Sequence, residues 1–137
     1  RYVVDKYLGG REDLEIIDLG SGFGGVCFEA AKLFSRARCT GVDIDPLKIA
    51  WSRAVARLKR LSERVRFVRG NILDMDLGEY DLVYMYLWQP ITHRIEEKII
   101  REAKKKVVIV SYHHSLKKTY VERRGKFYIG IYPREEV

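Results

Sequence analysis

One short stretch, residues 16–25, limits what this chain can fold into more than any other. Two isoleucines lead to an acid at Asp18, and four of the six residues from Gly20 to Gly25 are glycine. Glycine adopts backbone conformations that other residues avoid, and without a side chain it lets the backbone come close to a ligand. The stretch therefore predicts a buried strand, a tight turn and a helix start whose N–H groups face a ligand.

The rest of the chain alternates between strand-like and helix-like segments. Five largely apolar runs predict the strands of a parallel sheet: residues 14–19, 37–42, 65–68, 80–87 and 106–112. Apolar residues three and four apart predict helices over residues 3–8, from about 24, over 46–61 and after 92. The tail, residues 117–123 and 126–132, predicts a hairpin. We therefore expect an α/β, Rossmann-like three-layer sandwich around a mainly parallel seven-stranded sheet with a C-terminal antiparallel hairpin.

The helix expected over residues 46–61 has the clearest amphipathic pattern. Asp45 precedes Pro46, an arrangement that starts a helix without sacrificing a hydrogen bond. Lysines and arginines occupy one side of the helix. The apolar residues share the other side, which we expect to face the sheet: Leu47, Ala50, Trp51, Ala54, Val55, Leu58 and Leu61.

Length, charge and cysteine content narrow the class of protein. We expect residues 1–137 to form one domain, and the start at Arg1 rather than methionine is consistent with a short missing N-terminal segment. No apolar run approaches the roughly 20 residues that span a bilayer, so we expect no membrane partner. The net charge of +7 favours acidic partners or reflects a solvated basic surface. Cys27 and Cys39 lack metal-like spacing and are expected to be buried free thiols, which favours a cytoplasmic location.

Polar residues follow several of the predicted strands. In a parallel sheet the C-terminal strand ends lie along one edge, where open α/β sheets bind ligands. The glycine turn, Asp43, Gly70-Asn71, residues 86–90 and residues 112–115 all fall at this edge. We therefore expect one ligand site there.

Two cofactor classes fit the glycine turn. Gly20, Gly22 and Gly25 have the spacing of dinucleotide-binding turns. Asp18, Gly20, Gly22 and Gly24 instead have the spacing of turns that bind S-adenosylmethionine (SAM).

Three features favour SAM over a dinucleotide. The carboxylate of Asp18 attracts the ammonium and sulfonium groups of SAM, whereas it would repel a pyrophosphate. Asn71 offers a side-chain amide where an adenine edge would lie. The predicted hairpin replaces the second nucleotide-binding half that a dehydrogenase requires. Asp43 does not discriminate, because both cofactors carry a ribose.

Three segments together resemble the ordered motifs of class I SAM-dependent methyltransferases: residues 18–24, residues 41–46 and Gly70-Asn71. The resemblance spans nearly the whole chain and implies a SAM-dependent enzyme that releases S-adenosylhomocysteine. It implies that the turn holds the amino-acid portion of SAM, Asp43 the ribose and Asn71 the adenine. The implied cofactor-binding residues are Asp18, Gly20, Ser21, Gly22, Gly24, Asp43, Ile44, Asn71, Ile72 and Tyr86, and no metal ligands are expected. The alternative is that Asp18 only fixes the turn and Asp43 only caps the next helix.

Four further segments look like the small archaeal protein-lysine methyltransferases and their mitochondrial eukaryotic relatives: residues 30–32, 51–53, 81–87 and 107–112. This resemblance implies a lysine side chain of a protein as methyl acceptor. An apolar, aromatic-lined slot would lower the pKa of that lysine and favour its reactive neutral form. The residues expected to form the acceptor site are Tyr86, Trp88, Gln89 and Tyr112, whose aromatic members have packing roles as the alternative.

Other acceptors stay open. The basic, aromatic composition also suits nucleic acid, although residues 86–90 lack the Asp/Asn-Pro-Pro-aromatic run of base-amine methyltransferases. A small-molecule acceptor and a non-catalytic SAM-binding module are further alternatives. His113 and His114 follow the fifth strand, as a base or as surface residues. The charged strands of the hairpin resist edge pairing, so we expect a monomer.

Overall fold

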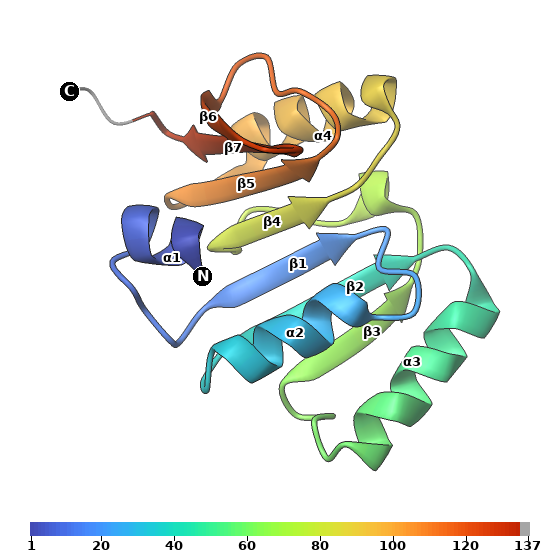
Figure 1. The fold of residues 1–137 in the computed structure, drawn as a ribbon. Helices are drawn as coiled ribbons and strands as arrows, with labels where there is room; N and C mark the ends of the chain where they lie inside the picture. Colours follow the sequence, from blue (N-terminus) through green and yellow to red (C-terminus); the bar gives the residue numbers. More distant parts are fainter. Residues whose placement is uncertain (135–137) are drawn as a thin grey trace.

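A seven-stranded sheet forms the middle layer of the computed structural model, which describes residues 1–134 (Figure 1). The strands are β1 (Glu15–Leu19), β2 (Arg38–Asp43), β3 (Val65–Arg69), β4 (Leu82–Met85), β5 (Val107–Tyr112), β6 (Tyr120–Arg124) and β7 (Phe127–Tyr132). The helices are α1 (Tyr2–Tyr7), α2 (Gly25–Leu33), α3 (Pro46–Leu58) and α4 (Gln89–Glu102), with a short 3-10 helix η1 (Ile72–Asp74). The sheet order is β3-β2-β1-β4-β5-β7-β6, in which the first five strands are parallel and the β6–β7 hairpin is antiparallel. The predicted fold class is confirmed.

Both faces of the sheet are buried, because neighbouring apolar residues of one strand point to opposite sides. Ile16 packs into a cluster with the inner residues of α1, α2 and α3, whereas Ile17 packs into a second cluster with α4. Figure 1 shows α2 in front of the sheet and α4 behind it. This two-sided burial explains why the strand sequences are apolar runs rather than alternating patterns.

The strand order changes direction between β1 and β4. The chain runs outward from β1 through β2 to β3 and then returns to build the other half of the sheet from β4. The segments after β1 and β4 therefore lead to opposite halves of the sheet, at the kind of position where open α/β sheets bind ligands. This position lies at the C-terminal strand ends, where the sequence places its ligand site.

Two differences between the predicted and observed element boundaries affect the site. Strand β4 is shorter than expected, and α4 begins at Gln89 rather than after Thr92. Pro90 occupies the first turn of α4, where its missing N–H and fixed φ are compatible with a helix. Residues 86–88 therefore connect the strand directly to the helix, which brings Gln89 into the site.

The predicted inner face of α3 is wrong. Leu47, Trp51 and Leu58 are 80%, 62% and 85% exposed, and the helix buries Ile49, Ser52 and Ala56 instead. The rotation of the helix is set by tertiary contacts, because the Ser52 hydroxyl donates to the Gly22 carbonyl oxygen at 3.3 Å. Small residues at this interface let α3 lie close to the sheet, and the more apolar side is left facing outward.

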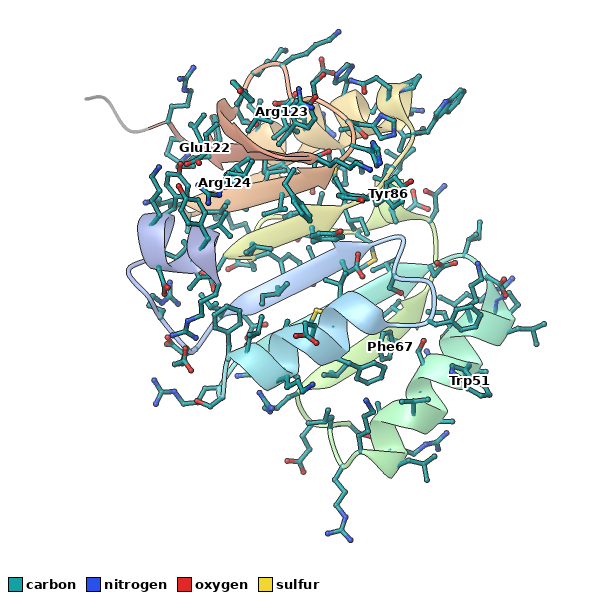
Figure 2. All side chains as sticks on the ribbon, viewed as in Figure 1. Trp51, Phe67, Tyr86, Glu122, Arg123 and Arg124 are labelled. Carbon is teal, nitrogen blue, oxygen red and sulfur yellow. A yellow bond between two sulfur atoms is a disulfide. The ribbon has the colours of Figure 1, made fainter. Side chains whose placement is uncertain are left out.

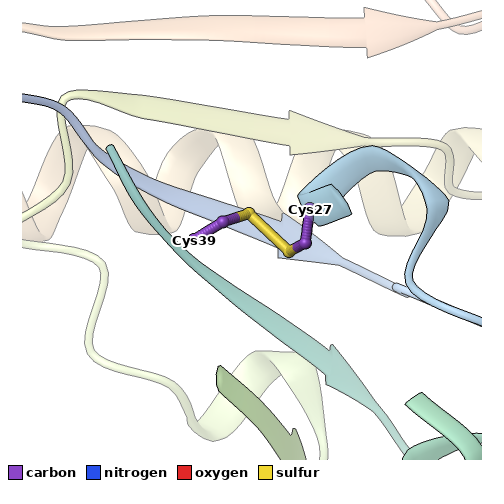
Figure 3. The surroundings of a disulfide bond; sticks show 2 residues. All are labelled: Cys27 and Cys39. Carbon is purple, nitrogen blue, oxygen red and sulfur yellow. A yellow bond between two sulfur atoms is a disulfide. The ribbon is translucent and has the colours of Figure 1, made fainter. Parts of the chain in front are cut away.

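The prediction of free thiols is also wrong. Cys27 in α2 and Cys39 in β2 form a disulfide, with their Cα atoms 5.3 Å apart (Figure 3). This separation lies within the usual range for a disulfide. The helix crosses directly over the strand, a proximity that a spacing of 12 residues does not reveal. The argument from free cysteines to a reducing compartment therefore does not hold.

Glu122 of β6 attaches the N-terminal helix to the hairpin. Its carboxylate accepts hydrogen bonds from the hydroxyls of Tyr2 and Tyr7 and from the ammonium of Lys6. Figure 2 shows Glu122 on the side of the hairpin that faces α1. These contacts hold α1 against the hairpin, on the same face of the sheet as α2 and α3. Among residues 1–134, no helix has the length and apolar character required to cross a membrane.

Candidate functional site

The glycine turn after β1 adopts the conformation that its sequence indicates. Gly20, Gly22 and Gly24 have φ values of 86°, 55° and 89°, in the left-handed region that favours glycine. A Cβ atom at Gly24 would lie 2.6 Å from the ring of Phe67, so a side chain is excluded there for steric reasons as well. Gly25 is the first residue of α2. The turn therefore uses the spacing of Gly20, Gly22 and Gly24, and the dinucleotide spacing has no structural counterpart.

The end of β2 holds this turn in place. The N–H groups of Gly20 and Ser21 donate to the Val42 carbonyl oxygen at 2.8 and 2.9 Å. The N–H group of Gly22 donates to Oδ2 of Asp43 at 2.8 Å. The turn and Asp43 therefore form one rigid unit.

Two polar side chains beside the turn are buried without a protein partner. Asp18 is 3% exposed, and no donor among residues 1–134 bonds to its carboxylate. Burial, together with the negative charge of Asp43, raises the pKa of Asp18 to about 7. The hydroxyl of Ser21 is also buried, and it too has no hydrogen-bond partner in the described part of the chain. Asp18 therefore does not fix the turn through its side chain, and both groups are available to a ligand.

Asp43 and Asp45 have different tasks. Asp45 caps α3 by accepting from the N–H groups of Leu47 and Lys48. Asp43 is not the cap, since it bonds to the N–H groups of Gly22 and Asp45. Each of its carboxylate oxygens keeps a lone pair for a second donor. Asp43 can therefore hold the turn and still accept hydrogen bonds from a ligand.

A pocket of about 330 Å³ opens beside Asp43 at the ends of β2 and β3. It brings together six of the residues at the expected ligand edge: Gly20, Asp43, Ile44, Gly70, Asn71 and Ile72. The oxygen Oδ1 of Asn71 accepts from the N–H of Leu73, which leaves the amide NH₂ for a ligand. A carboxylate, an amide and two isoleucines suit a ribose attached to a flat heterocycle. The residues present thus fit SAM, and the buried carboxylate of Asp18 in β1 suits the positive charges of that cofactor.

An aromatic cluster lies at the ends of β4 and β5. The ring of Tyr86 meets that of Tyr112 edge-on at 5.0 Å and stacks on His113 at 5.9 Å. Phe127, which pairs with Tyr112 across the β5–β7 ladder, adds a fourth ring 5.0 Å from Tyr112. His113 has a φ of 73°, rare for a residue with a side chain, and its N–H donates to the Lys126 carbonyl oxygen. The sequence analysis missed Phe127, because no motif in the tail indicates the hairpin register.

Gln89 lies at the same edge with both ends of its amide engaged. Its Oε1 lies 3.0 Å from Nδ1 of His114, and its Nε2 lies 2.8 Å from Nε2 of His93. The Nε2 also donates to the hydroxyl of Ser115 at 3.1 Å. Gln89 thus joins α4 to the loop after β5, and His93 is a partner that the sequence analysis did not predict.

Two parts of the predicted site remain to be compared with the structure: the position of Trp88 and the expected absence of metal ligands. Trp88 is 73% exposed at the start of α4 and is not part of the aromatic cluster around Tyr86. Within residues 1–134, no group of three or more histidine, cysteine, aspartate or glutamate side chains is arranged to hold a metal ion.

Comparison with known proteins decides the family. Residues 18–123 match the model of the ANTKMT methyltransferase domain, which is more than half of the chain. The chain belongs to this methyltransferase family. Its fold and family are those of SAM-dependent methyltransferases, and the glycine turn and Asp43 lie within the matched residues.

Curated relatives of this methyltransferase act on different acceptors. A protein-lysine N-methyltransferase of Saccharolobus islandicus is 27% identical over 77% of the chain. Norajmaline N-methyltransferase of Rauvolfia serpentina is 32% identical over 76% of it. The chain spans 66% of the first relative's length and 38% of the second's.

Solved structures show the same fold. An RNA methyltransferase from Salinibacter ruber, crystallised with S-adenosylhomocysteine, matches with a TM-score of 0.77 at 24% identity, over 100% of this chain and 94% of its own. PKMT2 from Rickettsia typhi, also in complex with the cofactor product, matches with a TM-score of 0.64 at 18% identity, over 74% of this chain and 21% of its own. The fold therefore accommodates several acceptors, and the acceptor must be argued from the site.

We expect Asp43→Ala to weaken SAM binding by roughly 30-fold or more, because two charge-assisted hydrogen bonds to a ribose would be lost. Isothermal titration calorimetry measures the effect. Asp45→Ala is the matched control, since it removes a neighbouring carboxylate and costs about 1 kcal/mol of stability through the helix cap. Equal affinity for SAM in wild type and Asp43→Ala, or preferential binding of NADH, would contradict the role given to Asp43.

Proposed function

We propose that this methyltransferase transfers the methyl group of SAM to lysine side chains of proteins. The observation that carries the proposal is the aromatic cluster of Tyr86, Tyr112, His113 and Phe127 at the sheet edge beside the glycine turn. The cluster lies at the ends of β4 and β5, and β4 is the neighbour of β1, whose end carries the turn. The similarity to a protein-lysine N-methyltransferase supports the same acceptor.

The cofactor is held by the two sides of the glycine turn. Asp18 and Ser21 bind the amino-acid portion, where a cation satisfies the buried carboxylate and a hydrogen bond satisfies the buried hydroxyl. The backbone of Gly20, Gly22 and Gly24 lets this portion approach closely. Asp43 accepts from the ribose, and Asn71 donates to the adenine between Ile44 and Ile72. Tyr86 completes the set at the β4 end of the site.

The reaction needs alignment more than acid–base help. Bound SAM supplies a methyl group on a sulfonium, which a neutral amine attacks in line while the carbon–sulfur bond breaks. A lysine amine surrounded by the rings of Tyr86 and Tyr112 loses solvation, which lowers its pKa and favours the neutral nucleophile. The proton leaves for solvent, and the aromatic rings exclude water from the reacting atoms.

The other predicted acceptor residues have supporting tasks. Gln89 positions the loop after β5 through His114 and Ser115, so it shapes the slot rather than binding the amine. Trp88 projects into solvent at the rim, where it contacts the substrate protein. This arrangement makes Tyr86 and Tyr112 the residues that touch the acceptor lysine.

Tritiated SAM incubated with cell extract tests the acceptor class. We expect protein-sized label that resists nuclease, is removed by protease and yields methyllysine on acid hydrolysis. Asp43→Ala serves as the control for labelling that does not depend on the enzyme. Label that survives protease and disappears with nuclease would replace the lysine proposal with RNA or DNA methylation, which the net charge of +7 also suits.

A further inference from the structure

A second surface, remote from the aromatic cluster, lies where α3 covers the edge of the sheet. A groove of about 710 Å³ runs along β3, the last strand on that side. Three arginines line it, Arg53 and Arg57 from α3 and Arg66 from β3. Its apolar floor includes Val65, Val68 and Met75. We call this surface the α3–β3 groove.

All the charged side chains that line the groove are positive. No aspartate or glutamate of the described residues lines it, and within residues 1–134 neither Arg57 nor Arg66 has an ion pair. Arg53 uses its Nε atom to donate to the Phe67 carbonyl oxygen at 3.0 Å, which orients its guanidinium over the strand edge. Three exposed guanidinium groups around an apolar floor are complementary to a ligand that is both anionic and apolar.

The strand edge adds a second recognition element. Among residues 1–134, β3 pairs only with β2, so its outer side has no neighbouring strand. On that side the Val65 N–H donates to the Leu61 carbonyl oxygen and the Phe67 carbonyl oxygen accepts from Arg53, so the other outward backbone groups are the ones left for a ligand. An extended peptide can bind such an edge with main-chain hydrogen bonds, while its alternate side chains point to opposite faces. Acidic side chains would then reach the arginines, and apolar ones would cover the floor.

Other occupants fit less well. A second copy of this chain would place arginines against arginines. Nucleic acid would satisfy the arginines, but it would leave the apolar floor of the groove uncovered. A flat bilayer could cover the outward face of α3, but it could not reach the backbone of β3 inside the groove.

We propose that the α3–β3 groove binds an extended acidic segment of the substrate protein, apart from the acceptor lysine. The inference rests on the proposed protein substrate. Three strand spacings separate β3 from β4, which is about 14 Å. The acidic segment must therefore lie at least about four residues from the methylated lysine in an extended substrate.

Fluorescence anisotropy with a blocked, fluorescein-labelled 12-residue peptide of alternating glutamate and valine tests the groove, without SAM and without methyl transfer. We expect Arg57→Glu/Arg66→Glu to weaken binding at least tenfold. Lys32→Glu/Arg36→Glu changes the net charge equally at exposed positions outside the groove and should alter the affinity less than twofold. Unchanged SAM affinity in both double variants would establish that they fold.

Three outcomes overturn the proposal: no peptide binding, equal losses in the two double variants, or equal binding of a peptide with glutamine in place of glutamate. Tighter, arginine-dependent binding of a 12-nucleotide oligouridylate, or of phosphatidylglycerol vesicles, would assign the groove to nucleic acid or to lipid instead. None of these outcomes affects the protease and nuclease experiment, whose failure would remove the lysine proposal separately.

Discussion

Asp18→Asn is expected to abolish measurable SAM binding and, at the same time, to stabilise the cofactor-free protein above neutral pH. The buried carboxyl has a pKa of about 7 in the folded protein, compared with 3.8 for an ordinary aspartate. The folded state therefore binds the proton more tightly, and ionisation destabilises it progressively as the pH rises from about 4 to 7. Above pH 7 the full free-energy cost of burying the ionised carboxylate is present, and the uncharged side chain of asparagine avoids that cost.

The size of this stabilisation depends on pH in a way that a general packing effect would not. At about 1.4 kcal/mol per pKa unit, the stability gain of Asp18→Asn should grow by about 2–3 kcal/mol between pH 5 and pH 8. Urea unfolding of the cofactor-free protein at both pH values measures it. Asp74→Asn, an exposed neutralisation on η1, should show no such growth.

The two effects of Asp18→Asn have one cause. A carboxylate buried without donors is costly in the free protein, and a cationic ligand offsets that cost only when it binds. SAM affinity of the wild-type protein should accordingly rise with pH through the region around 7. A variant that retains SAM binding, or that loses stability at pH 8, would show that Asp18 serves the turn rather than the ligand.

Glu96→Ala is expected to cost roughly 3–5 kcal/mol of folding stability, the largest loss among the single changes considered. The Glu96 side chain is buried on α4 and accepts from the backbone N–H groups of Lys117, Lys118 and Thr119 and from the Thr119 hydroxyl, at 2.7–2.9 Å. Burial alone would raise the pKa of Glu96, but these hydrogen bonds outweigh it and hold the pKa below its usual value. Alanine would leave four donors without an acceptor.

Urea unfolding of Glu96→Ala and Glu97→Ala at pH 7 tests this prediction. Glu97 is the adjacent residue, and its ion pair with Lys118 is exposed and 3.5 Å long, so its loss should cost less than about 1 kcal/mol. Similar losses in the two variants would contradict the anchoring role of Glu96. Because the lowered pKa of Glu96 makes its ionised form stabilising, the stability difference between wild type and Glu96→Ala should shrink as the pH falls through the acid range.

Glu96 also matters to the proposed acceptor site. It anchors the loop between β5 and β6, and the same loop carries Ser115, which bonds to Gln89. A variant that still folds with a loosened loop should therefore lose methyl transfer more than SAM binding.

The proposed cofactor side of the site was predictable because its residues follow strands. Asp18, Asp43 and Asn71 come at or directly after the C-terminal ends of β1, β2 and β3, and parallel topology brings such ends to one edge. Local patterns were sufficient here, since glycine conformation and strand order need no knowledge of distant side chains. The acceptor side was less predictable, because Phe127 reaches Tyr112 only through the register of the hairpin.

Local pattern thus determined the strands, the turn and the carboxylates of the proposed cofactor site. Tertiary contacts decided the rest. The rotation of α3 depends on the contact between Ser52 and Gly22, and the disulfide depends on α2 crossing β2. The hydrogen bonds of the Gln89 amide depend on two histidines from different elements, His93 of α4 and His114 of the loop after β5. A hydrophobic pattern records which residues favour burial, but the side that becomes buried is chosen by neighbours that are distant in the chain. For this reason the most apolar side of α3 faces outward beside the groove.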